Sequence, residues 1–288
     1  MKLIETMPHC NLLEVNLDKC ILEISLNRID VFNALNPKLI QELINIFSWA
    51  ANNSAATANS LVSDSGEILP RVIILKGNGK HFCAGADINW MKNSGEYTLE
   101  ENQKDAQKLD ELFYGIWSNP CFTIGLVKGV ALGGGAGLVA CLDHVIAMDG
   151  SKIAMSEIKL GILPAVIGPY VYRRLGSAQF RRLAMLGSRI NTDEALRIGF
   201  IDEIAKDETD LSINCNKIIS QILTSAPSAI EQAKFLCKTF DDWNENMKEL
   251  RNYTLKTTSV MRGGKEGQEG LGAFIERRDP EWHVNNEE

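Results

Sequence analysis

Four glycines fall within five residues of this sequence: Gly133, Gly134 and Gly135 in a row, then Gly137. They separate two apolar stretches in "VKGVALGGGAGLVACLD" (127–143). Glycine loses more conformational freedom on folding than other residues, so such a cluster indicates a strained turn or a close backbone approach. A glycine run between a strand and a helix also leaves backbone N–H groups uncovered, and these bind phosphate or stabilise an oxyanion. Tight helix packing is the alternative.

A phosphate loop does not fit the spacing, because no G-K-[ST] follows and the G-x-G-x-x-G pattern is missing. A second stretch, "GKHFCAGADINWM" (79–91), places Ala84, Gly85 and Ala86 between a predicted strand and a helical segment. One N–H from each of the two turns, aimed at the same carbonyl oxygen, would form an oxyanion hole. The two stretches together therefore predict a site that stabilises an enolate.

Strand and helix patterns alternate along the chain, which predicts an α/β fold. Asn36 and Pro37 are typical of the start of a helix, and Asn191 and Glu194 form a capping-box pattern. After about residue 205 only helical patterns follow. We expect a core over 1–204 and a helical region over 205–288. The strands are predicted over 19–27, 71–77, 121–129 and 144–150, and the helices over 36–50 and 98–117.

The stretch 50–69 interrupts this alternation, because its residues are mainly small and polar. Surface loops tolerate added length well, so we expect a mobile surface loop without a function of its own.

Composition excludes several classes of protein. The 288 residues carry a net charge of −7, which gives no electrostatic reason to expect nucleic acid or an anionic membrane as partner. Seven cysteines without a C-x-x-C pair and four histidines without ligand spacing predict reduced thiols, no metal site and a cytoplasmic protein. The start of the chain lacks a signal-peptide pattern, and no apolar run reaches the length of a membrane span.

Six motifs follow one another over nearly the whole chain. They are "LNRIDVFNALN" (26–36), "HFCAGADI" (81–88), "VALGGGAGLVACLD" (130–143), "SEIKLGILPAVIGP" (156–169), "GSRINTDEALRIGFIDEI" (187–204) and "EGLGAFIERRDPEW" (269–282). In this order they resemble the enoyl-CoA hydratase/isomerase, or crotonase, superfamily. The resemblance implies a crotonase fold of repeated ββα units, with a C-terminal helical region that joins subunits into a homotrimer or a dimer of trimers. It implies an acyl-CoA thioester as substrate and no separate cofactor, since coenzyme A is part of the substrate.

The resemblance also assigns catalytic residues. It gives the oxyanion hole to the backbone N–H groups of Ala84 and Gly134. Two-glutamate hydratases of the family carry glutamates at the positions of Gly137 and Glu157, where they move the protons of the added water. Here only Glu157 is present, and a carboxylate over an apolar pocket would have a raised pKa. The alternative is that Glu157 is a solvated or helix-capping carboxylate.

Three functions are compatible with a single glutamate: hydration of an enoyl thioester, the proton shuttle of a Δ3,Δ2-enoyl-CoA isomerase, and thioester binding with little activity. The "ADINWM" run, Gly137 and "GILPAVIGPYV" resemble the bacterial methylglutaconyl-CoA and carboxygeranoyl-CoA hydratases of leucine and terpene breakdown. This favours a hydratase for branched acyl groups with a distal carboxylate. RNA binding, reported for some superfamily members, is disfavoured because the helical stretch 98–117 is acidic.

Further sites come from the same resemblance. The CoA nucleotide is expected near Arg28 and the backbone of Ala84, Ala86 and Asp87, although Arg28 could form a surface salt bridge and Asp87 could cap a helix. The acyl pocket is expected to include Trp90, Met91, Gly137 and Pro164. Weaker assignments are Lys92 for a distal carboxylate, Arg277 and Arg278 for CoA phosphates, and Cys83 as a packing residue.

Overall fold

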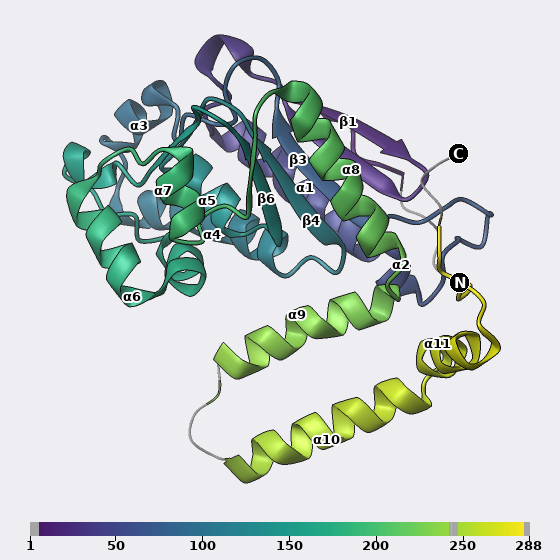
Figure 1. Ribbon diagram of the computed structural model, residues 1–288. Coiled ribbons are helices and arrows are strands. Elements are labelled where there is room, and N and C mark those ends of the chain that lie inside the picture. The colour runs from purple at the N-terminus through teal and green to yellow at the C-terminus, as the bar shows by residue number, and fades with distance from the viewer. Residues whose placement is uncertain (1–5, 242, 244–246, 285–288) are drawn as a thin grey trace.

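The computed structural model describes residues 6–241, 243 and 247–284. Its centre is a six-stranded sheet in the order β1-β2-β3-β4-β6-β8, in which β1 and β2 pair antiparallel and all other neighbours pair parallel (Figure 1). Strands β5 and β7 form a second, parallel sheet. The strands span Leu13–Asp18 (β1), Ile21–Leu26 (β2), Val72–Gly77 (β3), Phe122–Val127 (β4), Val130–Leu132 (β5), His144–Met148 (β6), Lys152–Ala154 (β7) and Glu203–Ala205 (β8).

Helices cover both faces of the large sheet. They span Pro37–Asn52 (α1), Ala55–Ala58 (α2), Ile88–Ser94 (α3), Leu99–Trp117 (α4), Gly134–Ala140 (α5), Gly168–Leu186 (α6), Thr192–Arg197 (α7), Glu208–Leu223 (α8), Pro227–Asp241 (α9), Met247–Gly263 (α10) and Lys265–Glu276 (α11). Two 3-10 helices span Ile29–Val31 and Glu157–Leu160.

The central strands bury both faces, as their nearly continuous apolar runs predict. Ile73 and Leu75 of β3 belong to a core shared with α1, α4 and α5. The alternating residues Val72 and Ile74 belong to a second core with α8. Figure 1 accordingly shows α8 on one face of the sheet and α1 on the other. The architecture confirms the predicted α/β class.

The local sequence signals located several of the elements. The predicted strands correspond to β2, β3, β4 and β6, and the predicted helices to α1 and α4. Asn36 caps α1 by accepting a hydrogen bond from the Leu39 N–H, and Asn191 caps α7 by accepting one from the Glu194 N–H. Strands β1, β5 and β7 were not predicted. The run 121–129 is not one strand, because β4 ends at Val127 and β5 begins three residues later.

The segment 50–69 is only partly a surface loop. Residues Asn53 to Ala56 are buried, α2 packs against α9, and Val62 forms an isolated bridge with Ile68. The surface position predicted for the whole segment is therefore wrong at Asn53 to Ala56, where small side chains let two helices approach closely.

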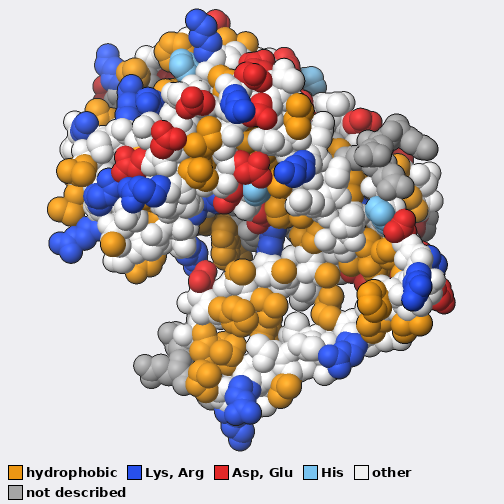
Figure 2. Space-filling view, viewed as in Figure 1, with side chains coloured by type: hydrophobic (Ala, Val, Ile, Leu, Met, Phe, Trp, Pro, Cys, Tyr) orange, Lys and Arg blue, Asp and Glu red, His pale blue; other side chains and the backbone are white. Residues whose placement is uncertain are grey.

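The C-terminal helices α9 to α11 extend away from the core (Figure 1). Figure 2 shows the arm formed by α9 and α10 standing apart from the core, with apolar side chains on its surface. α10 buries none of its residues. No helix in the described part of the chain is long and apolar enough to span a bilayer. The exposed apolar side chains of this region are Phe235, Phe240, Met247, Leu255, Val260, Leu271, Phe274 and Ile275.

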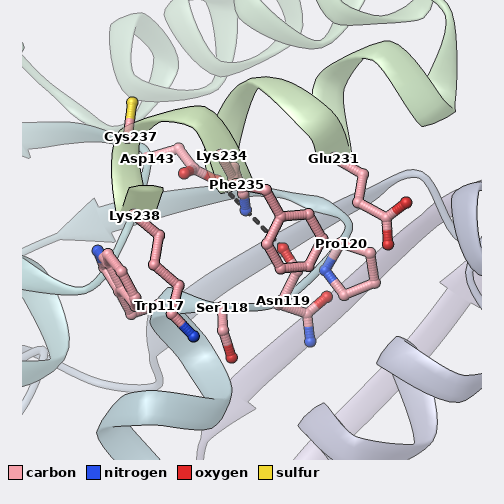
Figure 3. A pocket seen from close by; sticks show the side chains of 10 residues that line it. All are labelled: Trp117, Ser118, Asn119, Pro120, Asp143, Glu231, Lys234, Phe235, Cys237 and Lys238. Atoms are coloured by element: carbon pink, nitrogen blue, oxygen red, sulfur yellow. Dashed lines mark hydrogen bonds and ion pairs between the residues drawn. The ribbon is translucent and has the colours of Figure 1, made fainter. Parts of the chain in front are cut away.

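One lysine holds α9 against the core. Lys234 donates to the backbone carbonyls of Asn119 and Cys121, and its Nζ lies 2.6 Å from Asp143 Oδ2. These contacts cross one side of a cavity of about 180 Å³ between α9 and the end of α4 (Figure 3). The position of α9 is therefore fixed by charge-assisted hydrogen bonds as well as by packing.

Candidate active site

The two glycine turns predicted from the sequence meet in the structure. Gly85 has a φ of +96° and Gly133 a φ of +50°, conformations that side-chain-bearing residues rarely adopt. A Cβ atom on Gly133 would lie 4.0 Å from the Gly85 Cα, and one on Gly85 would lie 2.7 Å from the Leu132 carbonyl oxygen. Both glycines are therefore required, for conformation and for close approach.

The amide of Ala84 is already engaged. It donates to the Phe32 carbonyl at 3.0 Å. The structure therefore does not offer this N–H to a substrate, and the predicted role of Ala84 as oxyanion donor has to be corrected. The acceptor, Phe32, has a left-handed φ of +54°, which orients its carbonyl in a way that the sequence does not reveal.

The amide of Ala86, two residues after Ala84, is not engaged by a backbone acceptor. Ala86 forms a parallel bridge with Leu35, in which the Leu35 N–H donates to the Gly85 carbonyl (2.7 Å) and the Asp87 N–H donates to the Leu35 carbonyl (2.8 Å). Backbone groups alternate in direction along an extended segment, so the Ala86 N–H points away from Leu35. It has no acceptor in the part of the chain that the structure describes.

Gly134 supplies a second amide without a backbone acceptor among the described residues. It is the first residue of α5, and the N–H groups of a first turn have no acceptor within the helix. Ala86 and Gly134 each follow one of the two glycines, Gly85 and Gly133, that face each other. Ala86 and Gly134 are therefore the two amides at these turns that could together serve as donors of an oxyanion hole. Gly134 is also closely packed, since a Cβ atom there would lie 2.8 Å from Leu35 Cδ1.

Glu157 lies beside this pair of turns. It begins the 3-10 helix that follows β7, and a Cβ atom on Gly133 would lie 3.2 Å from its Oε1. Its Oε2 is buried without a hydrogen-bond partner among the described residues. Burial raises the pKa of Glu157, and a hydrogen bond from its own backbone N–H offsets part of that rise. A carboxyl group with a raised pKa is suited to exchanging protons with a substrate.

No residue of α5 supplies a second carboxylate beside Glu157. Gly137 is buried one turn after Gly133, and a Cβ atom there would collide with the side chain of Ile167 and lie 2.9 Å from Phe113 Cζ. The position that carries an acid in two-glutamate hydratases is thus filled by neighbouring apolar groups.

Arg28 and Asp87 are engaged with each other. Arg28 Nη2 lies 2.8 Å from Asp87 Oδ2, and its Nη1 donates to the Ala34 carbonyl. Asp87 also caps α3, because its side chain accepts from the Asn89 N–H at 2.9 Å. The side-chain hydrogen bond from Arg28 is the main reason why the pKa of Asp87 is lowered. Both alternatives to nucleotide binding, the salt bridge and the helix cap, therefore occur.

The residues assigned to the acyl pocket differ in exposure. Trp90 is half-buried, and its indole N–H donates to Asp105 Oδ2 at 2.7 Å. Met91 is half-buried, Pro164 is buried and Lys92 is exposed. Their roles toward an acyl group remain predictions.

The two arginines assigned to the CoA phosphates lie away from the two turns, whereas Cys83 packs beside them. Arg278 pairs with Glu269 and Glu276 at the end of α11, which Figure 1 shows far from α5. Arg277 ends the same helix with a left-handed φ of +57°. Burial raises the pKa of Cys83 to about 12, so its thiol stays protonated and packs as an apolar group. Within the described residues no three His, Cys, Asp or Glu side chains form a cluster that could hold a metal ion.

Sequence reasoning missed Asn33, which is fully buried. Its side chain donates to the carbonyls of Asn78 (3.0 Å) and His81 (2.7 Å), and accepts from the Arg28 N–H (2.8 Å). Asn33 lies within the quoted motif 26–36, but a polar residue in a loop gives no signal of burial. Asp105, Phe113 and Ile167 were missed as well, because their partners are distant in the sequence.

The family model described as enoyl-CoA hydratase/isomerase matches residues 16–285. The enoyl-CoA isomerase/hydratase fer4 of Mycosarcoma maydis is 30% identical over 259 residues, which cover 88% of this chain and 89% of the relative. The crystal structure of an enoyl-CoA hydratase from Shewanella pealeana is similar, with a TM-score of 0.85, 33% identity and coverage of 94% and 96% of the two chains. Pseudomonas aeruginosa AtuE has a TM-score of 0.85 and 30% identity, over 95% of this chain and 100% of AtuE. This chain therefore has the crotonase fold and belongs to the enoyl-CoA hydratase/isomerase family.

Proposed function

We propose that this chain adds water across the C2=C3 double bond of an enoyl-CoA thioester, with Glu157 as both base and acid. The observation that carries the proposal is the carboxylate of Glu157 beside Gly133, with one oxygen buried and unpartnered. The thioester carbonyl would lie between the amides of Ala86 and Gly134, with C2 and C3 under the carboxylate.

The reaction then needs one carboxylate. Glu157 accepts a proton from water as the water oxygen bonds to C3, and the electron pair of the double bond moves onto the thioester oxygen. The amides of Ala86 and Gly134 stabilise this enolate, each by about 3 kcal/mol. Glu157 then gives its proton to C2 as the carbonyl re-forms, so that one water has been added and the carboxylate is regenerated.

The closed position at Gly137 favours one alternative, a Δ3,Δ2-enoyl-CoA isomerase. In that reaction Glu157 takes a proton from C2 of a 3-enoyl thioester and returns it to C4, and no water has to be held. The same two amides stabilise the dienolate. A second carboxylate, for which Gly137 leaves no room, has no part in this chemistry.

For the acyl group we propose a branched enoyl-CoA with a distal carboxylate, such as 3-methylglutaconyl-CoA. The support is the resemblance of "ADINWM", Gly137 and "GILPAVIGPYV" to hydratases of that class. A place in leucine breakdown in the cytoplasm would follow.

For the assembly we propose a homotrimer or a dimer of trimers. The support is the apolar surface of α9 to α11, where α10 buries no residue against its own chain and Phe274 and Ile275 are 82% and 77% exposed. Surfaces of this kind on an ordinary globular protein are typical of protein interfaces.

The deciding experiment follows the ultraviolet absorbance of the conjugated enoyl thioester. We expect 3-methylglutaconyl-CoA to lose absorbance faster than crotonyl-CoA, and Glu157→Gln to abolish the loss. No change with either substrate would exclude the hydratase. A rise in absorbance with a 3-enoyl-CoA, abolished by the same substitution, would then establish the isomerase.

A further inference from the structure

We propose that Arg28 and Asp87 form a clamp that positions the Ala86 amide, so that Arg28 is a positioning residue and not a ligand of the CoA phosphates. The inference rests on the proposed function, because this amide is the one that would hold the thioester oxygen.

The contacts of Arg28 leave little of its guanidinium for a ligand. One end donates to the Ala34 carbonyl, and the other pairs with Asp87 Oδ2 at 2.8 Å. The side chains of Arg28 and Asp87 are only 15% and 10% exposed. A planar guanidinium that bonds two fixed acceptors defines their separation and angle, as a lysine ammonium does not.

The two partners of Arg28 lie on both sides of the segment that orients Ala86. Ala34 precedes Leu35, whose N–H and carbonyl bond the residues before and after Ala86. Asp87 follows Ala86 directly. The clamp therefore joins the extended segment around Leu35 to the extended segment around Ala86. It limits rotation of the peptide plane between Gly85 and Ala86, which carries the uncovered amide.

Asn33 connects the segment that contains Arg28 to the oxyanion segment. Its buried side chain accepts from the Arg28 N–H and donates to the His81 and Asn78 carbonyls at the start of the oxyanion segment. Asn33 has a left-handed φ of +56°, directly after Phe32 at +54°. Two consecutive residues in this region persist only where surrounding contacts hold them. These buried contacts therefore hold the segment that carries Arg28 against the start of the oxyanion segment.

Loosening these contacts should affect the transition state more than binding of the substrate. Misplacing a catalytic group by about 1 Å costs roughly 100-fold in rate. We expect Arg28→Met to lower kcat by about 10- to 100-fold and to leave the Kd for free CoA, which has no thioester carbonyl, within about twofold of wild type. An Arg28 that bound the phosphates would give the reverse pattern: a Kd for CoA weakened at least about tenfold and an unchanged kcat.

Two conservative variants separate the explanations further. Arg28→Lys keeps the positive charge but cannot bond Ala34 and Asp87 together, so we expect it not to restore kcat. Asp87→Asn keeps a residue that caps helices well, and it replaces the ion pair with Arg28 by a weaker hydrogen bond to a neutral amide oxygen. We expect this variant to lose kcat as well. Full activity in Asp87→Asn would contradict the clamp.

The carbonyl stretch of ¹³C-labelled butyryl-CoA bound to the protein gives a direct reading of the oxyanion hole. We expect a shift to lower frequency in wild type, and its loss in Arg28→Met and Asp87→Asn. The matched control is Arg174→Met. Arg174 lies on α6, its side chain is 13% exposed, and its Nη2 lies 2.6 Å from Asp202 Oδ2. This control should lower the Tm and leave both the shift and kcat unchanged.

Hydrogen exchange separates failure of the clamp from failure of the proposed function. The hydrogen-bonded amides of Ala84 and Asp87 should exchange faster in Arg28→Met and Asp87→Asn than in wild type, and not in Arg174→Met, whether or not the protein is a hydratase. A wild type with no turnover and no carbonyl shift would overturn the proposed function alone. Unchanged exchange at Ala84 and Asp87 in both variants would overturn the clamp.

Discussion

A Cβ atom added to Gly137 would run into the side chain of Ile167. Phe113 closes the other side, and Gly137, Ile167 and Phe113 are all buried. The absence of a second carboxylate is therefore built into the packing around α5 and is more than the loss of one side chain.

Gly137→Glu should not produce a second catalytic carboxylate. Overpacking of this kind costs about 1–3 kcal/mol, and burial of a charge adds to it. We expect a lower free energy of unfolding by urea denaturation and no gain in the hydration of crotonyl-CoA. Gly137→Glu combined with Ile167→Gly makes room and should recover part of the stability. If Gly137→Glu alone were as stable as wild type, this result would contradict the close packing around Gly137.

Glu157→Gln should remove activity without lowering stability at pH 7. Burial raises the pKa of Glu157 above its ordinary value of 4.5, so the folded state binds this proton more tightly than the unfolded state between the two pKa values. The free energy of unfolding therefore falls as the pH rises through that interval. Glu157→Gln has no carboxyl proton to release, so its free energy of unfolding does not fall in this way. It should be more stable than wild type at pH 7, with the difference vanishing below about pH 4. Urea denaturation across this pH range tests it, and a difference that grows on acidification would refute it.

Asp105→Leu should loosen α3. The helix buries none of its residues, and the hydrogen bond from Trp90 to Asp105 ties it to α4. Leaving the indole N–H of Trp90 without an acceptor should lower the stability of this contact by about 1–2 kcal/mol. We expect faster hydrogen exchange over 88–94, whereas Asp105→Asn, which retains an acceptor, should exchange nearly as slowly as wild type. Equal exchange in all three proteins would show that other contacts hold α3.

Lys234→Met should weaken the attachment of α9. It leaves the carboxylate of Asp143 and two backbone carbonyls without their cation, which should cost about 1.5–3 kcal/mol. Lys104→Met is the matched control, because Lys104 pairs with Glu100 on an exposed helix face, where such pairs contribute about 0.3–0.5 kcal/mol. Urea denaturation of both variants should separate them by at least about 1 kcal/mol.

Phe274→Asp should reduce the assembly. The side chain is 82% exposed on α11 of the single chain, so a charge there costs the monomer little but would disrupt an apolar interface. We expect a smaller mass by light scattering for this variant than for wild type. Lys104→Asp, on an exposed helix face of the core, serves as the control. A wild-type protein that is itself monomeric would exclude the proposed trimer.

Features encoded locally could be predicted from the sequence, and features that depend on distant partners could not. Asn36 and Pro37 mark the start of α1 because helix caps act within three residues. The glycines of both turns indicate tight backbone for the same reason. The direction of the Ala84 and Ala86 amides, in contrast, is set by Phe32 and Leu35, some fifty residues earlier in the chain.

The same limit applies to the surroundings of the site. Gly137 and Glu157 were found in the sequence, but the groups that fill the space at Gly137 come from α4 and from the start of α6. Likewise Ala55 and Ala56 read as loop residues, because their burial depends on α9, more than 170 residues later. In each case the missing information is the tertiary partner.

Because the uncovered N–H groups of Ala86 and Gly134 belong to the main chain, no replacement of a side chain except by proline deletes them. Proton transfer, in contrast, depends on one replaceable carboxylate, Glu157. A descendant of this chain could thus exchange one reaction of acyl thioesters for another by changing residues around the acyl chain, while activation of the thioester is inherited with the fold itself.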